Sequence, residues 1–336
     1  MTHEFKNIVE EAFKAKSKGL KSVLATVVAL DGSSYRKPGV RMLILENDAM
    51  VGAVSGGCVE KEVLLQSKQV FKTGASRIMT YDGRYRLGCE GVLYILLELF
   101  NLNSEFEASF FQTLKSRINF QIKSSYKKLE GVFNGIGSCV FLNDKVFSIS
   151  KVEVNLELQV FSQILKPLFK LVIIGAEHDA VELCKYAALT GWEVTVVSGV
   201  SELKSIKRFP GANSMVTTTP EAFNTKDIDS QTAIVLMTHN FAYDLRYLVA
   251  LKETSPNYIG LLGSVKRRDD LLNQFIEYCP NISDTFLDVI HGPAGLSIGS
   301  ITPQEIAVSI ISEILAYTRH KKPLSLSKKE KEIHSK

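Results

Sequence analysis

One cysteine in the N-terminal half has the surroundings of a reactive thiol. Cys58 follows Gly56 and Gly57, where an apolar stretch ends and an amphipathic helix is expected to begin. Consecutive glycines let the backbone turn sharply and direct its N–H groups at an anion, and the helix N-terminus adds partial positive charge. A thiol in this position is expected to have a lowered pKa. The alternative is that Cys58 is a small buried residue at a tight turn.

A second cysteine lies in a related setting. Cys89 stands between Gly88 and Gly91, and Glu90 follows it directly. A negative charge beside a thiol raises its pKa, and glycine neighbours are also typical of a structural turn. The chain has five cysteines in all, with no Cys-x-x-Cys pair and no zinc-type spacing, which favours free thiols.

A polar loop over residues 32–39 combines hydroxyls and cations. It contains Ser33, Ser34 and Arg36, and Arg41 follows just after it. Hydroxyl and guanidinium groups together suit a phosphate or a polar heterocycle. Solvated turns have a similar composition, so the loop alone decides nothing.

Polar side chains also follow the expected strands of the C-terminal half. His178 comes after the strand at 170–174, and His239, Arg267 and His291 follow the strands at 232–237, 258–262 and 288–290. The carboxyl ends of parallel strands open on one crevice, where ligands bind, so we expect a site there. A three-histidine metal centre is one alternative, and helix caps or polar core residues are another.

The first turn of this half departs from the dinucleotide-binding fingerprint. Gly175 is followed by Glu177 at the position where a glycine lets the backbone approach a pyrophosphate. Ser198 stands where an acid would bind the ribose. Binding of NAD(P) in its usual pose is therefore not expected.

The elements that must position these residues predict an α/β protein. Residues 1–165 read as a mixed α/β domain, with helices expected at 5–18, 59–71 and 103–117 and strands at 22–30, 41–45, 50–54, 77–81 and 92–99. Residues 166–320 alternate strand and helix, which predicts a Rossmann-like, doubly wound parallel sheet. Residues 321–336 form a basic tail that is expected to be disordered.

Charge and hydropathy exclude several classes of protein. The tail contains six Lys and two Glu and so accounts for the whole net charge of +4. The neutral remainder has no basic stripe for nucleic acid. No apolar run approaches the roughly 20 residues of a membrane span, and the N-terminus does not read as a signal peptide. We therefore expect a cytoplasmic protein.

Six motifs in order resemble the xanthine dehydrogenase accessory protein family, of the XdhC/CoxI type. They are GSSYRKPGVRM at 32–42, SGGCVE at 55–60, LVIIG at 171–175 with HDA at 178–180, YIGLLGS at 258–264, HGPAGLSIG at 291–299 and TPQEIA at 302–307. Each motif is moderately specific, and together they cover nearly the whole chain.

The resemblance implies a maturation chaperone rather than a turnover enzyme. Such a protein binds the molybdenum cofactor (molybdopterin), brings it to a cysteine desulfurase for sulfuration, and delivers it to apo-xanthine dehydrogenase or a related molybdenum hydroxylase. It also implies a homodimer. By position, Cys58 and Cys89 would contact the cofactor and its metal, while Arg36, Arg41 and the Gly56-Gly57 corner would suit the pterin's phosphate.

Two other functions compete with this interpretation. The first is an NAD(P)-binding oxidoreductase that uses the Rossmann-like domain. The second is a protein-interaction module without a small ligand.

Overall fold

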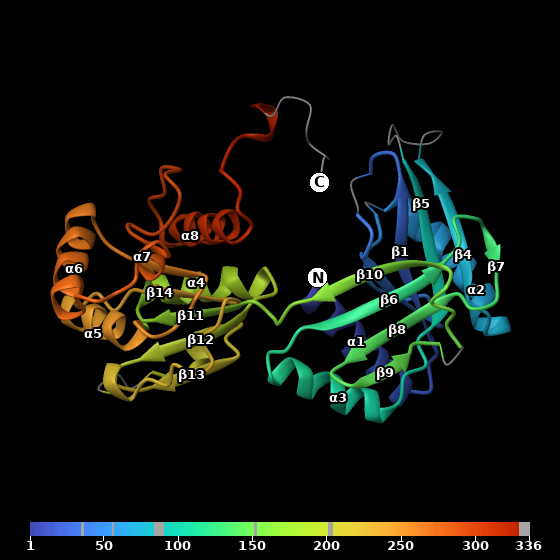
Figure 1. The fold of residues 1–336 in the computed structure, drawn as a ribbon, viewed down its shortest axis with the longest axis horizontal. Helices are drawn as coiled ribbons and strands as arrows, with labels where there is room; N and C mark the ends of the chain where they lie inside the picture. The colour runs from blue at the N-terminus through green and yellow to red at the C-terminus, as the bar shows by residue number, and fades with distance from the viewer. Residues whose placement is uncertain (35–36, 56, 84–90, 151–152, 201–203, 329–336) are drawn as a thin grey trace. The chain divides into compact units, whose positions relative to one another are not determined.

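The computed structural model describes residues 1–34, 37–55, 57–83, 91–150, 153–200 and 204–328 (Figure 1). The chain divides into two compact units, Met1–Pro167 and Leu168–Lys336. We call them the N-terminal unit and the C-terminal unit and describe each by itself.

The described strands of the N-terminal unit form two antiparallel sheets. The first sheet has the order β3-β2-β1-β5-β4-β7 and the second has the order β10-β6-β8-β9. The first comprises β1 (Ser22–Asp31), β2 (Arg41–Leu45), β3 (Met50–Gly52), β4 (Arg77–Asp82), β5 (Val92–Leu99) and β7 (Gly131–Val132). The second comprises β6 (Phe120–Tyr126), β8 (Gly137–Leu142), β9 (Lys145–Ser148) and β10 (Gln159–Leu165).

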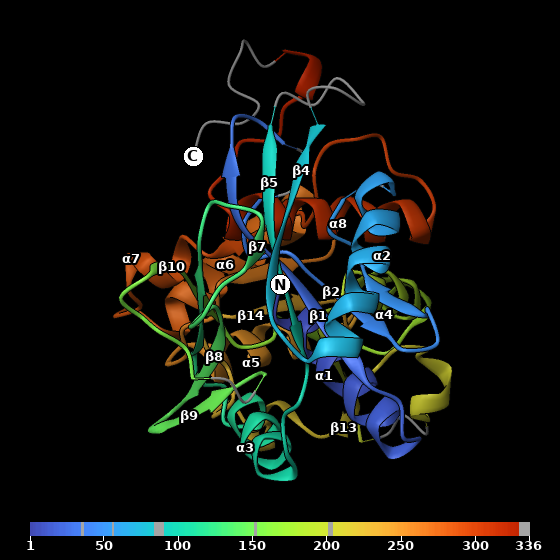
Figure 2. The ribbon, with the colours of Figure 1, turned by 90° about the vertical axis from the view of Figure 1, so that its right-hand side faces the viewer.

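Strand alternation gives the first sheet two buried faces. Val23, Ala25 and Val27 of β1 pack with helix α2 (Cys58–Thr73), which Figure 2 shows beside the sheet. Leu24 lies on the opposite face, in a cluster shared with α1 (Thr2–Ser17), α3 (Ser104–Lys115) and the second sheet. Both faces of β1 are therefore core, which explains its almost continuous apolar sequence.

The C-terminal unit has the doubly wound arrangement that its sequence predicts. Its parallel strands have the order β13-β12-β11-β14-β15-β16. They are β11 (Lys170–Ile174), β12 (Glu193–Ser198), β13 (Ser214–Thr217), β14 (Thr232–Leu236), β15 (Tyr258–Leu261) and β16 (Ile290–His291). Strands β11 and β14 are neighbours at the centre of the sheet. Strands β12 and β13 extend it on the side of β11, and β15 and β16 extend it on the side of β14, as in a Rossmann fold.

Helices cover both faces of this sheet. Helices α4 (His178–Leu189) and α8 (Pro303–Thr318) share one hydrophobic cluster, while α5 (Phe241–Leu251) and α6 (Val265–Tyr278) share the other. Short helices complete the unit: η2 (Ile206–Arg208), η3 (Pro220–Ala222), α7 (Asp284–Leu287) and η4 (Leu326–Lys328).

Some details differ from the sequence-based expectations. The strand expected at 288–290 lies at 290–291, so His291 ends β16 instead of following it. The sequence did not predict β13, because its four residues are only partly buried and carry little periodicity. In the part of the chain that the structure describes, no helix combines the length and apolar character of a membrane span.

Candidate functional site

The glycine corner before α2 is built around an internal carboxylate. The Glu60 carboxylate accepts hydrogen bonds from the N–H groups of Ser55 (2.6 Å) and Gly57 (2.9 Å) and from the Ser55 hydroxyl (2.6 Å). The Ser55 hydroxyl in turn accepts the N–H of Val59 (3.2 Å). Burial alone would raise the pKa of Glu60, but the hydrogen bonds from Ser55 and Gly57 lower it overall. These backbone donors are therefore used within the chain rather than left for an anion.

Cys58 is the first residue of α2. Gly57 before it has a φ of 120°, and a Cβ added there would meet nothing within 4 Å, so the surface at this point is open. Gly56, Arg36, Cys89 and the side chain of Cys58 lie outside the described residues.

Strand register brings several predicted segments to one end of the first sheet. Asp31, the last residue of β1, pairs with Val92 at the start of β5, and Val92 also pairs with Asp82 at the end of β4. The segment after β1, with Ser33, and the segment between β4 and β5, with Cys89, therefore leave the sheet at the same end. The sequence spacing alone could not show this.

These two segments also touch. A Cβ built on Gly91 would lie 2.4 Å from the backbone carbonyl oxygen of Ser33. Only a glycine fits such a close approach of two backbones. Ser34 lies next along the same segment and makes an interaction of its own.

Helix α2 begins near the same end of the sheet and runs away from it. It finishes at Gly74, where a Cβ would lie 3.8 Å from Leu99 at the far end of β5. Its 16 residues span about 24 Å, close to the roughly 27 Å of the eight-residue β5. Val59 in its first turn shares a cluster with Leu93 of β5. The start of α2, with Cys58, therefore lies near the end of the sheet that carries Ser33 and Gly91.

Arg41 does not reach that surface. We expected it to contribute to an anion site, but its side chain is buried between the two sheets and only 7 % exposed. Its Nη1 donates to the carbonyl oxygen of Gly39 (3.0 Å) and to Gln163 Oε1 (2.6 Å). The cause is the alternation of β2, which turns Arg41 to the face that packs against the second sheet. Burial lowers the pKa of Arg41 to about 10, so it remains charged at neutral pH.

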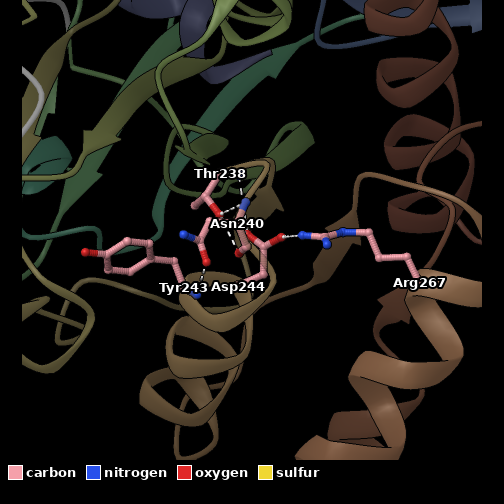
Figure 3. Close-up of polar contacts among 5 residues, drawn as sticks. All are labelled: Thr238, Asn240, Tyr243, Asp244 and Arg267. Carbon is pink, nitrogen blue, oxygen red and sulfur yellow. Dashed lines mark hydrogen bonds and ion pairs between the residues drawn. The ribbon is translucent and has the colours of Figure 1, made fainter.

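In the C-terminal unit a buried carboxylate organises the turn after β14 (Figure 3). Asp244, 3 % exposed, accepts hydrogen bonds from the Thr238 hydroxyl (2.7 Å) and N–H (3.3 Å). It also forms an ion pair with Arg267 Nη2 at 2.6 Å. Asn240 caps α5 by accepting the N–H of Tyr243 (3.2 Å). Arg267 is therefore neutralised and fixed rather than left as a free cation.

A small crevice lies at the carboxyl ends of β11, β12 and β14. Its volume is about 140 Å³, and hydroxyl and amide side chains line part of it: Thr218, Thr219, Thr238, Asn240 and Tyr243. Polar groups from separate strands converge there, as expected for this fold.

An ion pair lies at the start of α4, beside the turn where a Rossmann fold usually binds a dinucleotide's pyrophosphate. Lys204 pairs with the Glu177 carboxylate and donates to the carbonyl oxygen of Ala176 (2.9 Å) at the start of α4. The hydrogen bond from Lys204 lowers the pKa of Glu177, which is therefore charged at neutral pH. At the end of β12, Ser198 pairs with the hydroxyl of Thr217 at 3.2 Å. Glu177 and Ser198, which depart from the dinucleotide-binding fingerprint, thus both have partners within the chain.

Two of the three histidines of this unit lie at the start of α4, and the third lies among aromatic rings. His178 begins α4, and His239 Nε2 lies 3.9 Å from Asp179 Oδ2. The His291 ring stacks on Tyr258, with 4.6 Å between centroids, and meets Tyr317 edge-on at 4.4 Å. Burial lowers the pKa of His291, so its ring is neutral at pH 7.

The three-histidine metal centre left open by the sequence is not formed. Among the described residues no group of three or more His, Cys, Asp and Glu side chains could bind a metal. The physical reason is topological, because β15 separates β14 from β16 and the aromatic rings retain His291.

Sequence reasoning missed Ser55, Glu60, Thr238, Asn240 and Asp244. Two local signals could have found them. Asn240 stands three residues before Tyr243 at a helix start, and Glu60 stands in the first turn of a helix after a serine, as in capping motifs. The link between Asp244 and Arg267 crosses 23 residues and has no local signal.

The chain matches sequence models of known domains in both halves. The XdhC Rossmann domain matches residues 171–314, and the XdhC and CoxI family matches residues 15–82. Both matches agree with the resemblance seen in the motifs.

Two similar proteins and a solved structure extend over most of the chain. A Bacillus subtilis protein named as a probable subunit of xanthine dehydrogenase is 28 % identical over 320 residues, covering 88 % of this chain and 92 % of that protein. The molybdenum cofactor insertion chaperone PaoD of Escherichia coli is 25 % identical over 325 residues, covering 95 % and 91 %. A crystal structure described as a xanthine dehydrogenase from Bacillus halodurans is 27 % identical, with a TM-score of 0.77, and covers 94 % of this chain and 96 % of that one.

Proposed function

Because this chain belongs to the XdhC and CoxI family, we propose that it binds the molybdenum cofactor and acts as an accessory protein in the maturation of a xanthine dehydrogenase-type enzyme. The name of PaoD, a molybdenum cofactor insertion chaperone, supports insertion as the task. Sulfuration by a cysteine desulfurase, action as a homodimer and a cytoplasmic location belong to the same proposal.

The observation that carries the proposal is the convergence of three segments at one end of the first sheet. Ser33 and Gly91 are in contact there, and α2 begins nearby with Cys58. Cys89 lies two residues before Gly91 in the sequence. This convergence supports the proposal that thiols and hydroxyls from distant parts of the chain serve one ligand.

The residues at this end suit a pterin that carries a soft metal. A thiolate is a soft ligand that can contact molybdenum, which would be the role of Cys58 and Cys89. The surface at Gly57 is open, with nothing within 4 Å of an added Cβ. Because Glu60 and Ser55 take the backbone donors of Gly57 and Val59, we assign the cofactor's phosphate to the segment with Ser33, Ser34 and Arg36. When bound, the cofactor supplies the redox-active metal of the target enzyme.

The C-terminal crevice would then have a secondary role. His178, His239, His291 and Arg267 were predicted as cofactor contacts, but none of them lines this crevice, whereas Thr238 and Asn240 do. Because hydroxyl and amide side chains line the crevice, it suits an uncharged, hydroxyl-rich part of a ligand better than a phosphate.

Retention of the cofactor tests the thiol roles. The purified chain is mixed with molybdenum cofactor and desalted, and bound metal and pterin are assayed for wild type, Cys58→Ala and Cys89→Ala. We expect stoichiometric retention by wild type and a loss of at least about tenfold in each variant. Cys279→Ala is the matched control, because Cys279 is a buried thiol of the C-terminal unit.

The opposite results are equally informative. Unchanged retention in Cys58→Ala, with normal folding, would remove the cysteine role. No retention by wild type would contradict cofactor binding itself.

A further inference from the structure

The N-terminal unit contains a group of buried polar atoms between its two sheets that no protein atom satisfies. In the described residues, Arg41 Nε and Nη2, Thr26 Oγ1 and Glu98 Oε1 are each buried and have no hydrogen-bond partner. Thr26 and Glu98 have no exposed surface, and Arg41 is 7 % exposed. A buried polar atom without a partner costs about 1–3 kcal/mol, so such a group needs a physical explanation.

Strand register places these atoms on one face of the first sheet. Thr26 of β1 pairs with Arg41 of β2, and Leu24 of β1 pairs with Glu98 of β5. Residues paired across antiparallel strands point to the same side, and residues two apart share a face. Arg41, Thr26 and Glu98 therefore all point toward the second sheet, with β1 between the two charged residues.

The other polar atoms of the charged pair are already used. Arg41 Nη1 donates to Gly39 and Gln163, and Glu98 Oε2 accepts the N–H of Ser138 (2.9 Å). What remains is the Nε–Nη2 edge of the guanidinium, which normally binds a carboxylate in bidentate fashion. On the other side remains one oxygen of Glu98, Oε1, and the buried Ser150 hydroxyl interacts with the same carboxylate and lowers its pKa. The two groups interact electrostatically, yet no hydrogen bond joins them.

We propose that buried water molecules bridge Arg41 to Glu98 and Thr26 in this site. A buried water needs two to four polar partners, and the site offers two donors on Arg41, an acceptor on Glu98 and a hydroxyl that can do either. Water can satisfy all four atoms. The inference is independent of the proposed cofactor function.

Arg41 also holds the end of the segment that follows β1. Arg41 Nη1 donates to the carbonyl oxygen of Gly39, which ends the segment that starts at Ser33. The Phe5 ring of α1 lies 5.5 Å from the guanidinium on another side. Water on the Nε–Nη2 edge thus completes the hydrogen bonding of the residue that anchors the base of this segment.

A high-resolution crystal structure of the full chain, grown at pH 8, tests the site directly. We expect water density about 2.7–3.2 Å from Arg41 Nε or Nη2 and from Glu98 Oε1. A direct Arg41–Glu98 ion pair without water would overturn the proposal. So would an anomalous peak after a bromide soak, because it would identify a small anion as the occupant.

One substitution is expected to change the stability in opposite directions depending on whether the site contains water, and this gives an independent test. Val has the shape of Thr without the hydroxyl, so Thr26→Val relieves an unpaired hydroxyl if the site is dry. In a wet site it removes a partner of the water. We expect the unfolding equilibrium constant of Thr26→Val to rise about fivefold in urea. A variant as stable as wild type, or more stable, would overturn the proposal.

The spectroscopic signal used to follow unfolding must come from the N-terminal unit, where Thr26 lies. Trp192, the single tryptophan, lies in the C-terminal unit. Unfolding is therefore followed by circular dichroism, to which the strands of the N-terminal unit contribute.

Discussion

At the N-terminus of α2, Glu60 takes the place that an external anion would otherwise occupy. Its carboxylate accepts the N–H groups of Ser55 and Gly57, and it lies two residues after Cys58. The partial positive charge of the helix terminus is thus partly compensated from within. A ligand at Cys58 is therefore expected to be recognised through the thiol and the open surface rather than as an anion.

A second carboxylate, Glu98, gives the N-terminal unit a pH-dependent stability. Burial raises the pKa of Glu98 to about 7, against hydrogen bonds from Ser138 and the charge of Arg41, which lower it. Cys139 of β8 and Glu4 of α1 are the other titratable groups that interact with this pair. Because the folded-state pKa lies above the unfolded value, the folded state binds the proton more tightly.

Stability should consequently fall as pH rises from about 4.5 to 7. The free energy of unfolding should fall by on the order of 3 kcal/mol over this range, because the pKa of Glu98 rises from 4.5 to about 7 on folding. We expect Glu98→Gln to remove this part of the pH dependence and to be more stable than wild type at pH 8, measured by urea unfolding at pH 5 and pH 8. The exposed Glu130→Gln is the control. A wild-type profile that is flat in this range would contradict the assignment.

At the scale of elements, one glycine decides whether two segments of the candidate site can meet. Gly91 precedes β5 and lies against the backbone of Ser33, which follows β1. A methyl group there would clash with a carbonyl oxygen and would move the segments that carry Ser33 and Cys89 apart.

We therefore expect Gly91→Ala to lose cofactor retention by about tenfold or more, as when the support of a ligand-bearing residue is displaced. The measurement is bound molybdenum after desalting, with circular dichroism to confirm folding. Gly74→Ala is the control, because Gly74 has a φ of 73° at the opposite end of α2 and should lower stability without touching the site. Equal loss in both variants would point to stability alone.

At the scale of the whole molecule, the chain consists of two units, each with its own hydrophobic core. The clusters of the N-terminal unit and those of the C-terminal unit share no residue. The C-terminal unit has a Rossmann sheet, and the ion pair of Lys204 and Glu177 lies beside the turn that usually binds phosphate in this fold. The Rossmann fold of this unit therefore does not by itself imply a dinucleotide ligand.

We expect no thermal shift of the full chain with about 1 mM NAD or NADP, because a bound ligand would raise the melting temperature. The measurement is differential scanning fluorimetry or calorimetry over a ligand series. A saturable shift with either nucleotide would contradict this expectation and would favour the oxidoreductase alternative.

The fold class and most of the helices and strands could be predicted from the order of the amino acids. The Rossmann character of the second half followed from alternating short apolar strands and helices, and residues such as Glu177 and Ser198 already indicated an altered nucleotide site. These features are local, because backbone preference and burial leave a period in the sequence that neighbouring residues reveal.

Which distant residues meet became visible only in the folded chain. Folding placed Arg41 in the interior on the same sheet face as Glu98, kept His291 apart from the other two histidines, and joined Ser33 to Gly91 and Asp244 to Arg267. These contacts depend on sheet order and strand register, and a shift of one residue would turn each side chain to the opposite face. No local pattern in the chain contains that information, because register is set by the packing of whole elements against one another.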